Sequence, residues 1–429
     1  MTARVAIIGA GYAGLAAAVE LAAAGIGVDV FEASRTLGGR ARAIEIDGIT
    51  LDNGAHILAG AYTETLRLMD VVGAPATGLL RLPLHLEFPG AFRLHAPRLP
   101  APLHLAWALL RAHGLAWRDK LAALAFMRRQ QRAAFRLPAD TTVGALLAAE
   151  PEATRRFLWE PLCLAALNTA PARASAQIFL NVLRDSLAGT RAASDLLLPT
   201  VDFSSLFPEP AARFVEARGG RVLRGTRIDR VRRAASAYVL DGLAEYSKVI
   251  VAVAPYHLPA LLSELPELAT TIAQVEQLGW EPIVTCYLAY PEFVRLPQPM
   301  IGVLGGTAQW LFDRGQTHGQ PGVIAAVISA SRRHREIEAG ALADEIHAEI
   351  GRIVPALPLP LWTRVVTEKR ATFACTPGVP RPLTLTPLPG LLLAGDFVAS
   401  DYPATIEGAV RSGGAAAGSL LQQPSRGQP

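Results

Sequence analysis

Three glycines close to the N-terminus have the spacing that binds the phosphates of a dinucleotide. Gly9, Gly11 and Gly14 form a G-x-G-x-x-G pattern, and the carboxylate of Glu32 follows at the end of the next apolar segment. In this pattern the first glycine allows a tight turn, the second lets a pyrophosphate approach the backbone, and the third lets a helix lie close to a sheet. A carboxylate at the position of Glu32 can accept hydrogen bonds from a ribose. These residues predict a dinucleotide site.

The segments around these glycines predict the elements that hold them in place. We expect a strand over Val5–Ile8, a helix over Gly14–Ala24 and a second strand that ends at Glu32. The helix N-terminus offers free N–H groups and a partial positive charge to phosphate oxygens. Because Glu20 and Asp29 interrupt the apolar run, we expect neither a signal peptide nor a membrane span here.

A segment near the C-terminus has the features of a second half of the same site. Residues 390–421 read as a buried strand, a turn at Gly395 and Asp396, a loop, and a helix of small residues. A flavin dinucleotide needs both of its ends held, the pyrophosphate at one helix N-terminus and the flavin end near another. The two distant segments together predict one FAD site.

Two shorter segments after the second predicted strand support this interpretation. In the run from Gly38 to Arg42, Gly39 permits close backbone approach, and Arg40 and Arg42 are fork-shaped donors for phosphate oxygens. Farther along, Gly54 lies between polar residues inside an apolar stretch. A glycine in that setting suits backbone that is pressed against a flavin edge.

Taken together, these residues resemble the amine-oxidase and phytoene-desaturase superfamily of FAD enzymes, over nearly the whole chain. In that superfamily the glycine fingerprint is followed by G-G-R-x-R, here Gly38 to Arg42, and a distant Gly-Asp precedes E-G-A-x-x-S-G, here Glu407 to Gly413. The resemblance implies that Asp396 binds the ribityl or pyrophosphate region, that amides near Thr405 and Ile406 face the flavin, and that Ile228 lies close to adenine. The FAD-binding residues predicted in this way are Gly9, Gly11, Tyr12, Ala13, Gly14, Glu32, Gly38, Gly39, Arg40, Arg42, Gly54, Ile228, Gly395, Asp396, Thr405 and Ile406.

Within the superfamily, four segments are similar to the hydroxysqualene dehydroxylase family of bacterial hopanoid pathways. These segments are Leu51–Tyr62, Glu368–Gly378, Arg381–Thr384 and Leu391–Gly413. The chain departs from the pattern at Phe397, where a Trp is common, and at Cys375, in a stretch that usually lacks a thiol. Neither departure affects the prediction of FAD binding.

The resemblance implies an FAD-dependent oxidoreductase that turns hydroxysqualene into squalene. Reduced FAD would deliver a hydride to the allylic carbon as the hydroxyl leaves, and because hydroxide leaves poorly we expect a general acid. His56 is the candidate, since the usual pKa of histidine lies near the operating pH, and Glu407 is a second candidate. Each has a structural alternative: His56 could fix its own loop, and Glu407 could anchor the C-terminal helix. Tyr62, Tyr402 and Phe397 are candidates for the cavity wall.

Two other functions remain open at this point. The first is oxidative chemistry on the same fold, by a carotenoid or polyene desaturase or by an amine oxidase, although the apolar inserts argue against a charged amine. The second is a non-catalytic prenyl-binding chaperone without FAD, which would have no need of the intact pyrophosphate-binding residues. The sequence holds no second dinucleotide fingerprint, so the electron donor is unknown.

Composition excludes several other classes. The net charge of +4 is too small to favour nucleic-acid binding. The three cysteines are widely spaced, and the nine histidines show no HExxH pattern. We therefore predict neither a disulfide framework nor a metal site. Reduced cysteines are typical of the cytoplasm, so we expect a cytoplasmic chain. The hydrophobic fraction of 51% is high, which fits an apolar substrate cavity or a membrane-facing patch for a long-chain isoprenoid.

The order of the motifs predicts an α/β fold with a discontinuous Rossmann-type FAD-binding domain and an inserted α+β substrate domain. We assign residues 1–75, 205–260 and 385–421 to the FAD-binding domain, residues 76–204 and 261–384 to the substrate domain, and residues 422–429 to a disordered tail. We expect a strand pair at Arg221–Val231 and Ser236–Tyr246 and then a strand at Lys248–Ala254. The first insert should be mostly helical beyond Pro102. The second should contain strands at Pro282–Ala289 and Gly322–Ser329 and a helix near Ala341–Ile353.

One stretch of the first insert is unusually basic. Between Phe88 and Ala139, Asp119 is the only acidic residue among many arginines, and Trp107 and Trp117 are interleaved with leucines at helical spacing. A basic, aromatic amphipathic region suits peripheral contact with the inner face of the cytoplasmic membrane. The alternative is a solvated helix face over a packed core.

Overall fold

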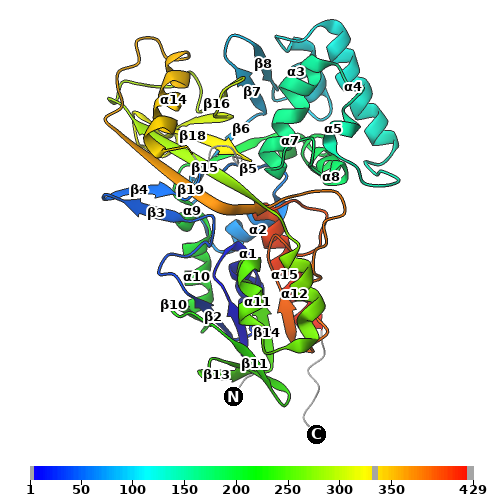
Figure 1. The fold of residues 1–429 in the computed structure, drawn as a ribbon, viewed down its shortest axis with the longest axis vertical. Coiled ribbons are helices and arrows are strands. Elements are labelled where there is room, and N and C mark those ends of the chain that lie inside the picture. Colours follow the sequence, from blue (N-terminus) through cyan, green and yellow to red (C-terminus); the bar gives the residue numbers. More distant parts are fainter. Residues whose placement is uncertain (1–3, 331–336, 423–429) are drawn as a thin grey trace.

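The computed structural model describes residues 4–330 and 337–422, which form an elongated molecule with a parallel sheet in its lower half and an antiparallel sheet in its upper half (Figure 1). The strands are β1 Val5–Ile8, β2 Val28–Glu32, β3 Ala43–Ile46, β4 Ile49–Asp52, β5 Leu58–Ala59, β6 Leu79–Leu82, β7 His85–Phe88, β8 Phe92–His95, β9 Leu196–Pro199, β10 Arg221–Arg224, β11 Val231–Ala234, β12 Ala237–Leu240, β13 Ala244–Tyr246, β14 Lys248–Val251, β15 Trp280–Ala289, β16 Met300–Gly302, β17 Trp310–Asp313, β18 Val323–Ser329, β19 Trp362–Phe373 and β20 Leu391–Leu393. The α-helices are α1 Tyr12–Ala23, α2 Thr63–Val71, α3 Leu103–Arg111, α4 Trp117–Arg132, α5 Val143–Leu146, α6 Glu152–Thr154, α7 Glu160–Leu167, α8 Ala176–Leu187, α9 Phe203–Leu206, α10 Pro208–Glu216, α11 Leu258–Leu261, α12 Ala269–Glu276, α13 Arg314–Thr317, α14 Ala339–Gly351 and α15 Ile406–Gln422.

The parallel sheet has five strands in the order β10-β2-β1-β14-β20. Its strands are short apolar runs, and β1, β14 and β20 are almost wholly buried, as expected for a parallel sheet that is covered on both faces. Helices α10 and α15 pack against α1, which contacts β1 and β2. This arrangement confirms the predicted α/β fold class with a Rossmann-type sheet.

Glycines allow α1 and α15 to approach each other and the sheet closely. A Cβ atom added to Gly413 would lie only 2.1 Å from the carbonyl oxygen of Ala13, and one added to Gly14 would lie 1.9 Å from that of Gly9. Side chains at either position would push α1 away from its neighbours. The small residues of the C-terminal helix therefore set the distance between the two halves of the predicted FAD site.

The antiparallel sheet has five strands in the order β16-β17-β18-β15-β19. Its longest pairing joins β15 to β19, and α14 packs against both of these strands. The helices α3 to α8 lie beside this sheet in the upper half of the molecule (Figure 1). Asn168 connects the two parts, because its amide donates to the Thr372 hydroxyl at 3.0 Å and accepts from the Ala330 amide at 2.7 Å.

Most predicted elements are present with small shifts at their ends. The helix predicted to start at Gly14 starts at Tyr12 as α1, the strand expected over Lys248–Ala254 ends at Val251, and the strands and helix predicted in the second insert correspond to β15, β18 and α14. Beyond Pro102 the first insert is mostly helical, as predicted. How the chain divides into domains stays a prediction.

One prediction about the fold was wrong, and another falls mostly outside the described residues. The expected strand pair starting at Arg221 does not form: β10 joins the parallel sheet beside β2, and the hairpin is made by β11, β12 and β13. A turn at Gly225, with φ of +66°, ends β10 before the hairpin begins. Gln422, which we assigned to the tail, is the last residue of α15, and the tail beyond it lies outside the described residues.

Candidate functional site

The cavity of interest lies beyond the carboxyl ends of the parallel strands, where ligands bind in sheets of this type. It has a volume of about 750 Å³ and is lined by residues that directly follow β1, β14 and β20, among them Gly9, Ala252 and Gly395. It continues to the antiparallel sheet, where Ile283 and Trp310 line it. One cavity thus reaches from the predicted nucleotide site to the second half of the molecule.

The N-terminus of α1 forms a cradle that fits a pyrophosphate. No side chain caps this helix at Gly11, its first turn carries no acidic residue, and Gly11, Tyr12 and Ala13 line the cavity. A Cβ added to Gly11 would meet only the Cα of Gly39, at 3.8 Å. The free helix N-terminus and the absence of side-chain bulk leave room for phosphate oxygens beside backbone N–H groups.

Glu32 lies at the end of β2 and borders the cavity. Its carboxylate accepts hydrogen bonds from the backbone N–H of Ala10 at 2.7 Å and of Ser34 at 2.8 Å. These bonds hold the side chain beside the glycine turn, in the place where the fingerprint requires a ribose acceptor. Ile228, predicted at the adenine end, also lines this part of the cavity.

Arg40 and Asp396 form an ion pair at 2.6 Å. Both residues were assigned to the FAD site from the sequence, although they lie in distant parts of the chain. Arg40 also donates to the carbonyl oxygen of Ala371 at 2.7 Å. Although burial would lower the pKa of Arg40, the charge of Asp396 and the hydrogen bond to it keep that pKa above its usual value. Arg42 instead turns back to donate to the carbonyl oxygen of Gly39 at 2.5 Å.

Arg381 was not among the predicted site residues, although it shapes the loop that carries several of them. Its guanidinium donates to the backbone carbonyl oxygens of Asp396, Phe397 and Tyr402, at 2.8, 3.2 and 2.9 Å. This fan of bonds folds the loop between β20 and α15. The planar guanidinium of arginine can donate several hydrogen bonds in a fixed fork, which the ammonium of lysine cannot do. The sequence does not show which carbonyl groups Arg381 contacts, because that depends on the fold.

The structure brings most of the predicted FAD residues to one cavity. Those that line it are Gly9, Gly11, Tyr12, Ala13, Glu32, Gly38, Gly39, Arg40, Arg42, Ile228, Gly395, Asp396, Thr405 and Ile406. Gly14 and Gly54 are not part of its lining: Gly14 packs against Gly9, and Gly54 lies beneath His56 with φ of +113°. Of the aromatic candidates for the wall, Tyr62 lines the cavity, whereas Phe397 is buried in the core and Tyr402 lies under Arg411.

His56 lines the cavity, and its Nε2 atom has no hydrogen-bond partner among the described residues. The ring packs edge-on against Phe203 with 5.2 Å between centroids. Burial lowers the pKa of His56, while the charge of Asp52 raises it and that of Arg40 lowers it further. The ring is therefore neutral near pH 7, with one buried nitrogen that has no hydrogen-bond partner among the described residues.

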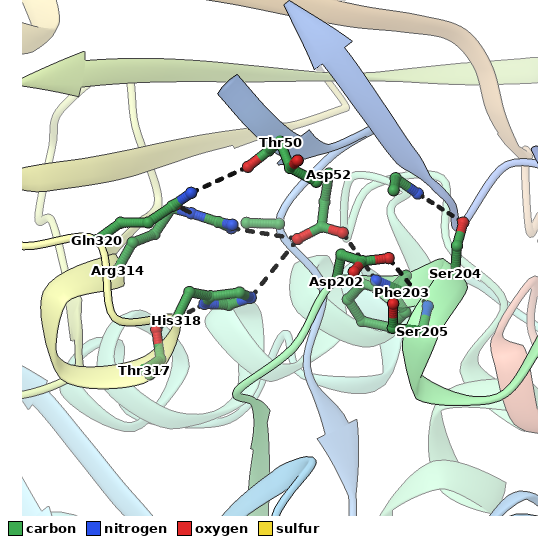
Figure 2. A network of polar contacts seen from close by, with 12 residues as sticks. Thr50, Asp52, Asp202, Phe203, Ser204, Ser205, Arg314, Thr317, His318 and Gln320 are labelled. Carbon is green, nitrogen blue, oxygen red and sulfur yellow. Dashed lines mark hydrogen bonds and ion pairs between the residues drawn. The ribbon is translucent and has the colours of Figure 1, made fainter. Parts of the chain in front are cut away.

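A buried polar network fixes the base of the loop that carries His56 (Figure 2). The carboxylate of Asp52, at the end of β4, accepts from the Phe203 amide at 2.9 Å and pairs with the Arg314 guanidinium at 3.2 Å. His318 lies 3.6 Å from the same carboxylate, an ion-pair distance that is too long for a good hydrogen bond. Sequence reasoning missed this network because Arg314 and His318 stand in the second insert, far along the chain from Asp52.

The charges of the network shift the pKa values of its members. Burial would raise the pKa of Asp52, but His318, Arg314 and the Phe203 amide outweigh burial and hold that pKa below its usual value. For His318, burial is the largest cause and lowers the pKa, as does Arg314, against the opposing effect of Asp52. The network thus holds Asp52 as a carboxylate and disfavours a second positive charge on His318.

These shifts predict how stability depends on pH. The folded-state pKa values of His56 and His318 are depressed, so between neutral pH and about pH 5 the unfolded chain binds protons that the folded chain does not. The free energy of unfolding should therefore fall as the pH is lowered, by at most about 1.4 kcal/mol per pH unit for each histidine. Urea denaturation at several pH values measures this slope. His318→Gln should make it shallower, and a free energy that rises on acidification would contradict the assignment.

Glu407 lies outside the cavity lining, which corrects our expectation that it is a second candidate acid. Its carboxylate is fully buried and accepts bonds from the backbone N–H of Glu64 and Thr65, from the Thr65 hydroxyl and from Arg411. It therefore joins the N-terminus of α2 to α15. Glu64 and Thr65 stand more than 340 positions away along the chain, whereas Arg411 is four residues farther along α15, and these bonds agree with the alternative that Glu407 anchors the C-terminal helix.

The wall of the cavity along the antiparallel sheet is largely apolar. The apolar side chains that the sheet contributes are Ile283, Met300, Trp310, Phe312 and Val327. Among the described residues, the carboxylates that line the cavity are Glu32, Asp229, Glu368 and Asp396, and of these Glu368 lies on β19 of the same sheet. Glu368 accepts a hydrogen bond from Asn53 at 3.1 Å. The wall favours a hydrocarbon over a charged amine.

Two features are absent from residues 4–330 and 337–422. Over these ranges, no helix is both long enough and apolar enough to cross a membrane. Within the same part of the chain, no cluster of His, Cys, Asp and Glu side chains has the composition to hold a metal ion. The three cysteines are free thiols buried in the interior, where burial raises the pKa of Cys286 to about 12.

Comparisons with known proteins agree with this geometry. The model of the flavin-containing amine oxidoreductase family matches residues 12–421. Hydroxysqualene dehydroxylase of Rhodopseudomonas palustris is 32% identical, with 98% of this chain and 99% of that protein covered. Hydroxysqualene dehydroxylase of Sinorhizobium fredii is 30% identical, with 97% and 98% covered.

A solved structure has the same fold. Cyclohexylamine oxidase from Brevibacterium oxydans superposes with a TM-score of 0.69 at 20% sequence identity, over 99% of this chain and 100% of that one. At this level of identity the likeness concerns the architecture alone. The cradle at the N-terminus of α1, the carboxylate of Glu32 and the Arg40–Asp396 pair are the features on this chain that fit FAD.

Proposed function

The chain belongs to the flavin-containing amine oxidoreductases and, within them, to the hydroxysqualene dehydroxylase family, and from this premise we propose that it converts hydroxysqualene to squalene in bacterial hopanoid biosynthesis. It is an FAD-dependent oxidoreductase, and its relationship implies an isoprenoid substrate. The observation that carries the proposal is a single cavity in which the nucleotide cradle continues into an apolar wall.

When bound, reduced FAD would supply the hydride that replaces the allylic hydroxyl, which leaves as water after it accepts a proton. We assign FAD to the cavity-lining residues named above. Gly11 and Gly39 leave space for the pyrophosphate, Glu32 would accept a hydrogen bond from the ribose, and the Arg40–Asp396 pair would hold the flavin end. The apolar wall excludes water and accommodates the hydrocarbon chain.

His56 is the residue that we propose to hold and protonate the leaving hydroxyl. His56 lines the cavity, and its Nε2 atom has no hydrogen-bond partner among the described residues. A lowered pKa makes the protonated ring a stronger acid but also a scarcer one near pH 7. Turnover should therefore increase as the pH falls toward the pKa of His56.

His56→Ala tests this role with a readout that a purely structural residue would not change. The variant should keep its FAD and lose turnover by about 10²- to 10⁴-fold, the usual contribution of a general acid. The pH profile should also lose the limb that rises toward low pH. His56→Gln, which can still donate a hydrogen bond, is the matched control for positioning. Unchanged turnover and an unchanged profile in the alanine variant would remove His56 from the mechanism.

The desaturase and amine-oxidase alternatives have less support. Both relatives described above are hydroxysqualene dehydroxylases, and Glu368, the carboxylate that the antiparallel sheet places at the cavity, already accepts a hydrogen bond from Asn53. The reaction is tested by supplying hydroxysqualene, zeta-carotene and a primary amine separately to the flavinated enzyme and identifying products by mass spectrometry. We expect squalene from the first and no product from the others; an oxidised product from either of the others would overturn the proposal.

We also propose that the protein is cytoplasmic and contacts the inner face of the cytoplasmic membrane peripherally. A long-chain isoprenoid partitions into the bilayer, so an enzyme that acts on it benefits from lying at the membrane surface. The basic and aromatic stretch between Phe88 and Ala139 supports this location.

A further inference from the structure

Helices α3 and α4 expose large apolar side chains at the end of the molecule opposite to the two chain termini (Figure 1). On α3, Leu103, Trp107 and Leu110 follow the spacing of one helix face, and on α4, Trp117 and Leu121 do the same. The exposed fractions reach 58% for Leu103, 63% for Trp117 and 61% for Leu121. We refer to these five side chains as the α3–α4 face.

Both helices are otherwise anchored in the core, so the exposure is not a sign of loose packing. Ala108 of α3 and Ala123 and Phe126 of α4 are buried, and the ring of Phe126 packs against Trp159 with 4.9 Å between centroids. Lys120 on α4 donates to the carbonyl oxygen of Leu110 on α3 at 2.7 Å, which joins the helices. The α3–α4 face is therefore a fixed surface whose apolar side chains remain exposed in the described chain.

Cations lie beside the apolar side chains, and the nearest acid is withdrawn from solvent. The Arg111 guanidinium lies 5.5 Å from the ring centroid of Trp107, and the Lys120 ammonium lies 5.2 Å from that of Trp117. Asp119 has only 7% of its side chain exposed, and its carboxylate accepts a hydrogen bond from the Ala116 amide at 3.1 Å. Arg128 stands two helical turns beyond Leu121 on the same side of α4. The surface is apolar at its centre and positive at its edge.

From this combination we infer that the α3–α4 face docks onto a lipid bilayer that contains anionic headgroups. Tryptophan side chains favour the boundary between headgroups and acyl chains, leucines gain by entering the acyl region, and Arg and Lys attract anionic lipids. Apolar side chains that are exposed together on one face mark an interaction surface, whereas scattered single ones are normal. The inference rests on the proposed membrane location but not on the proposed reaction, because vesicle binding is measured without substrate.

Sedimentation of the FAD-loaded, full-length protein with vesicles tests this inference. We expect binding to vesicles of phosphatidylcholine mixed with phosphatidylglycerol, and weaker binding to phosphatidylcholine alone or at high salt. Trp107→Ser combined with Trp117→Ser should reduce the bound fraction at least tenfold on both kinds of vesicle. Arg111→Gln combined with Arg128→Gln should remove the preference for anionic vesicles.

The matched control is Leu359→Ser combined with Leu361→Ser, since these leucines are 78% and 69% exposed but lie on a different segment, before β19. The control should bind vesicles as the parent protein does. The inference is overturned if the parent protein stays in the supernatant with anionic vesicles, or if the control loses as much binding as the tryptophan variant. Self-association that disappears in the tryptophan variant, without vesicle binding, would assign the face to a second copy of the chain and would likewise overturn it.

Discussion

Gly11→Leu should give a folded protein that has lost its FAD. At Gly11 the backbone has φ of −76°, which any residue adopts, and the nearest atom to an added Cβ would be 3.8 Å away. The fold should therefore tolerate the substitution. The leucine side chain would instead occupy the space between α1 and Gly39 where the pyrophosphate must approach the backbone.

Absorbance of the purified protein and flavin titration measure this effect. We expect the affinity for FAD to fall at least tenfold, which is a loss of about 1.4 kcal/mol or more, with little change in the melting temperature of the flavin-free protein. Asp396→Ala, which removes the partner of Arg40, should also reduce FAD content. Gly414→Ala on α15, where an added Cβ meets nothing within 4 Å, is the matched control and should remain fully flavinated. Full occupancy in Gly11→Leu would show that the cradle is not where the pyrophosphate binds.

Gly14→Ala separates folding from cofactor binding at the same helix. Here the added Cβ would lie 1.9 Å from the carbonyl oxygen of Gly9, so α1 must move off the sheet. This variant should lose stability even before FAD is considered, whereas Gly11→Leu should not. The contrast between the two variants distinguishes a glycine that is needed by the fold from one that is needed by the ligand.

Asp52→Ala should destabilise the protein more than most single substitutions. The substitution leaves the Arg314 guanidinium buried, with 3% of its side chain exposed, and removes the acceptor of the Phe203 amide. Breaking a buried ion pair by removing one partner typically costs about 3–5 kcal/mol. The loss should appear as a lower denaturant midpoint in urea.

A double substitution identifies the cause. If the uncompensated charge of Arg314 dominates, Asp52→Leu combined with Arg314→Met should be less destabilising than Asp52→Ala alone, because two apolar partners replace the pair together. Asp52→Asn keeps the shape and should lie between the parent and Asp52→Ala. An effect of Asp52→Ala below about 1 kcal/mol, the range of an exposed pair, would show that the network does not brace the His56 loop.

Local motifs allowed the cofactor half of the molecule to be predicted well. The glycine fingerprint and the strand before it depend on residues that are neighbours in sequence, so β1 and α1 could be predicted directly, although α1 starts at Tyr12 and not at Gly14. Both Arg40 and Asp396 were predicted to lie at the FAD site, but each was expected to bind the cofactor and not the other residue. Their carboxylate–guanidinium bond spans 356 positions and could not be deduced from spacing.

Features that depend on distant partners were missed. The strand β10 was assigned to a hairpin because its neighbours in sequence are also strand-like, whereas its partner β2 lies about 190 positions earlier. Buried Asp29 of β2 binds Arg221 of β10 at 2.7 Å and Arg4 at 2.7 Å, which explains the acidic residue that interrupts the apolar run. The Asp52–Arg314–His318 network escaped prediction for the same reason, as did the partners of Glu407 on α2, although its role as an anchor of the C-terminal helix was one of the two alternatives.

We propose that this chain binds FAD and uses it in reduced form to remove the hydroxyl of hydroxysqualene. The most direct measurement is the absorbance spectrum of the anaerobic, reduced, FAD-loaded enzyme during addition of hydroxysqualene, with squalene quantified from the same sample. The account predicts that bound flavin becomes oxidised as squalene forms, one flavin for each squalene. Flavin that stays reduced with hydroxysqualene, while the oxidised enzyme is reduced by a polyene or an amine, would contradict it.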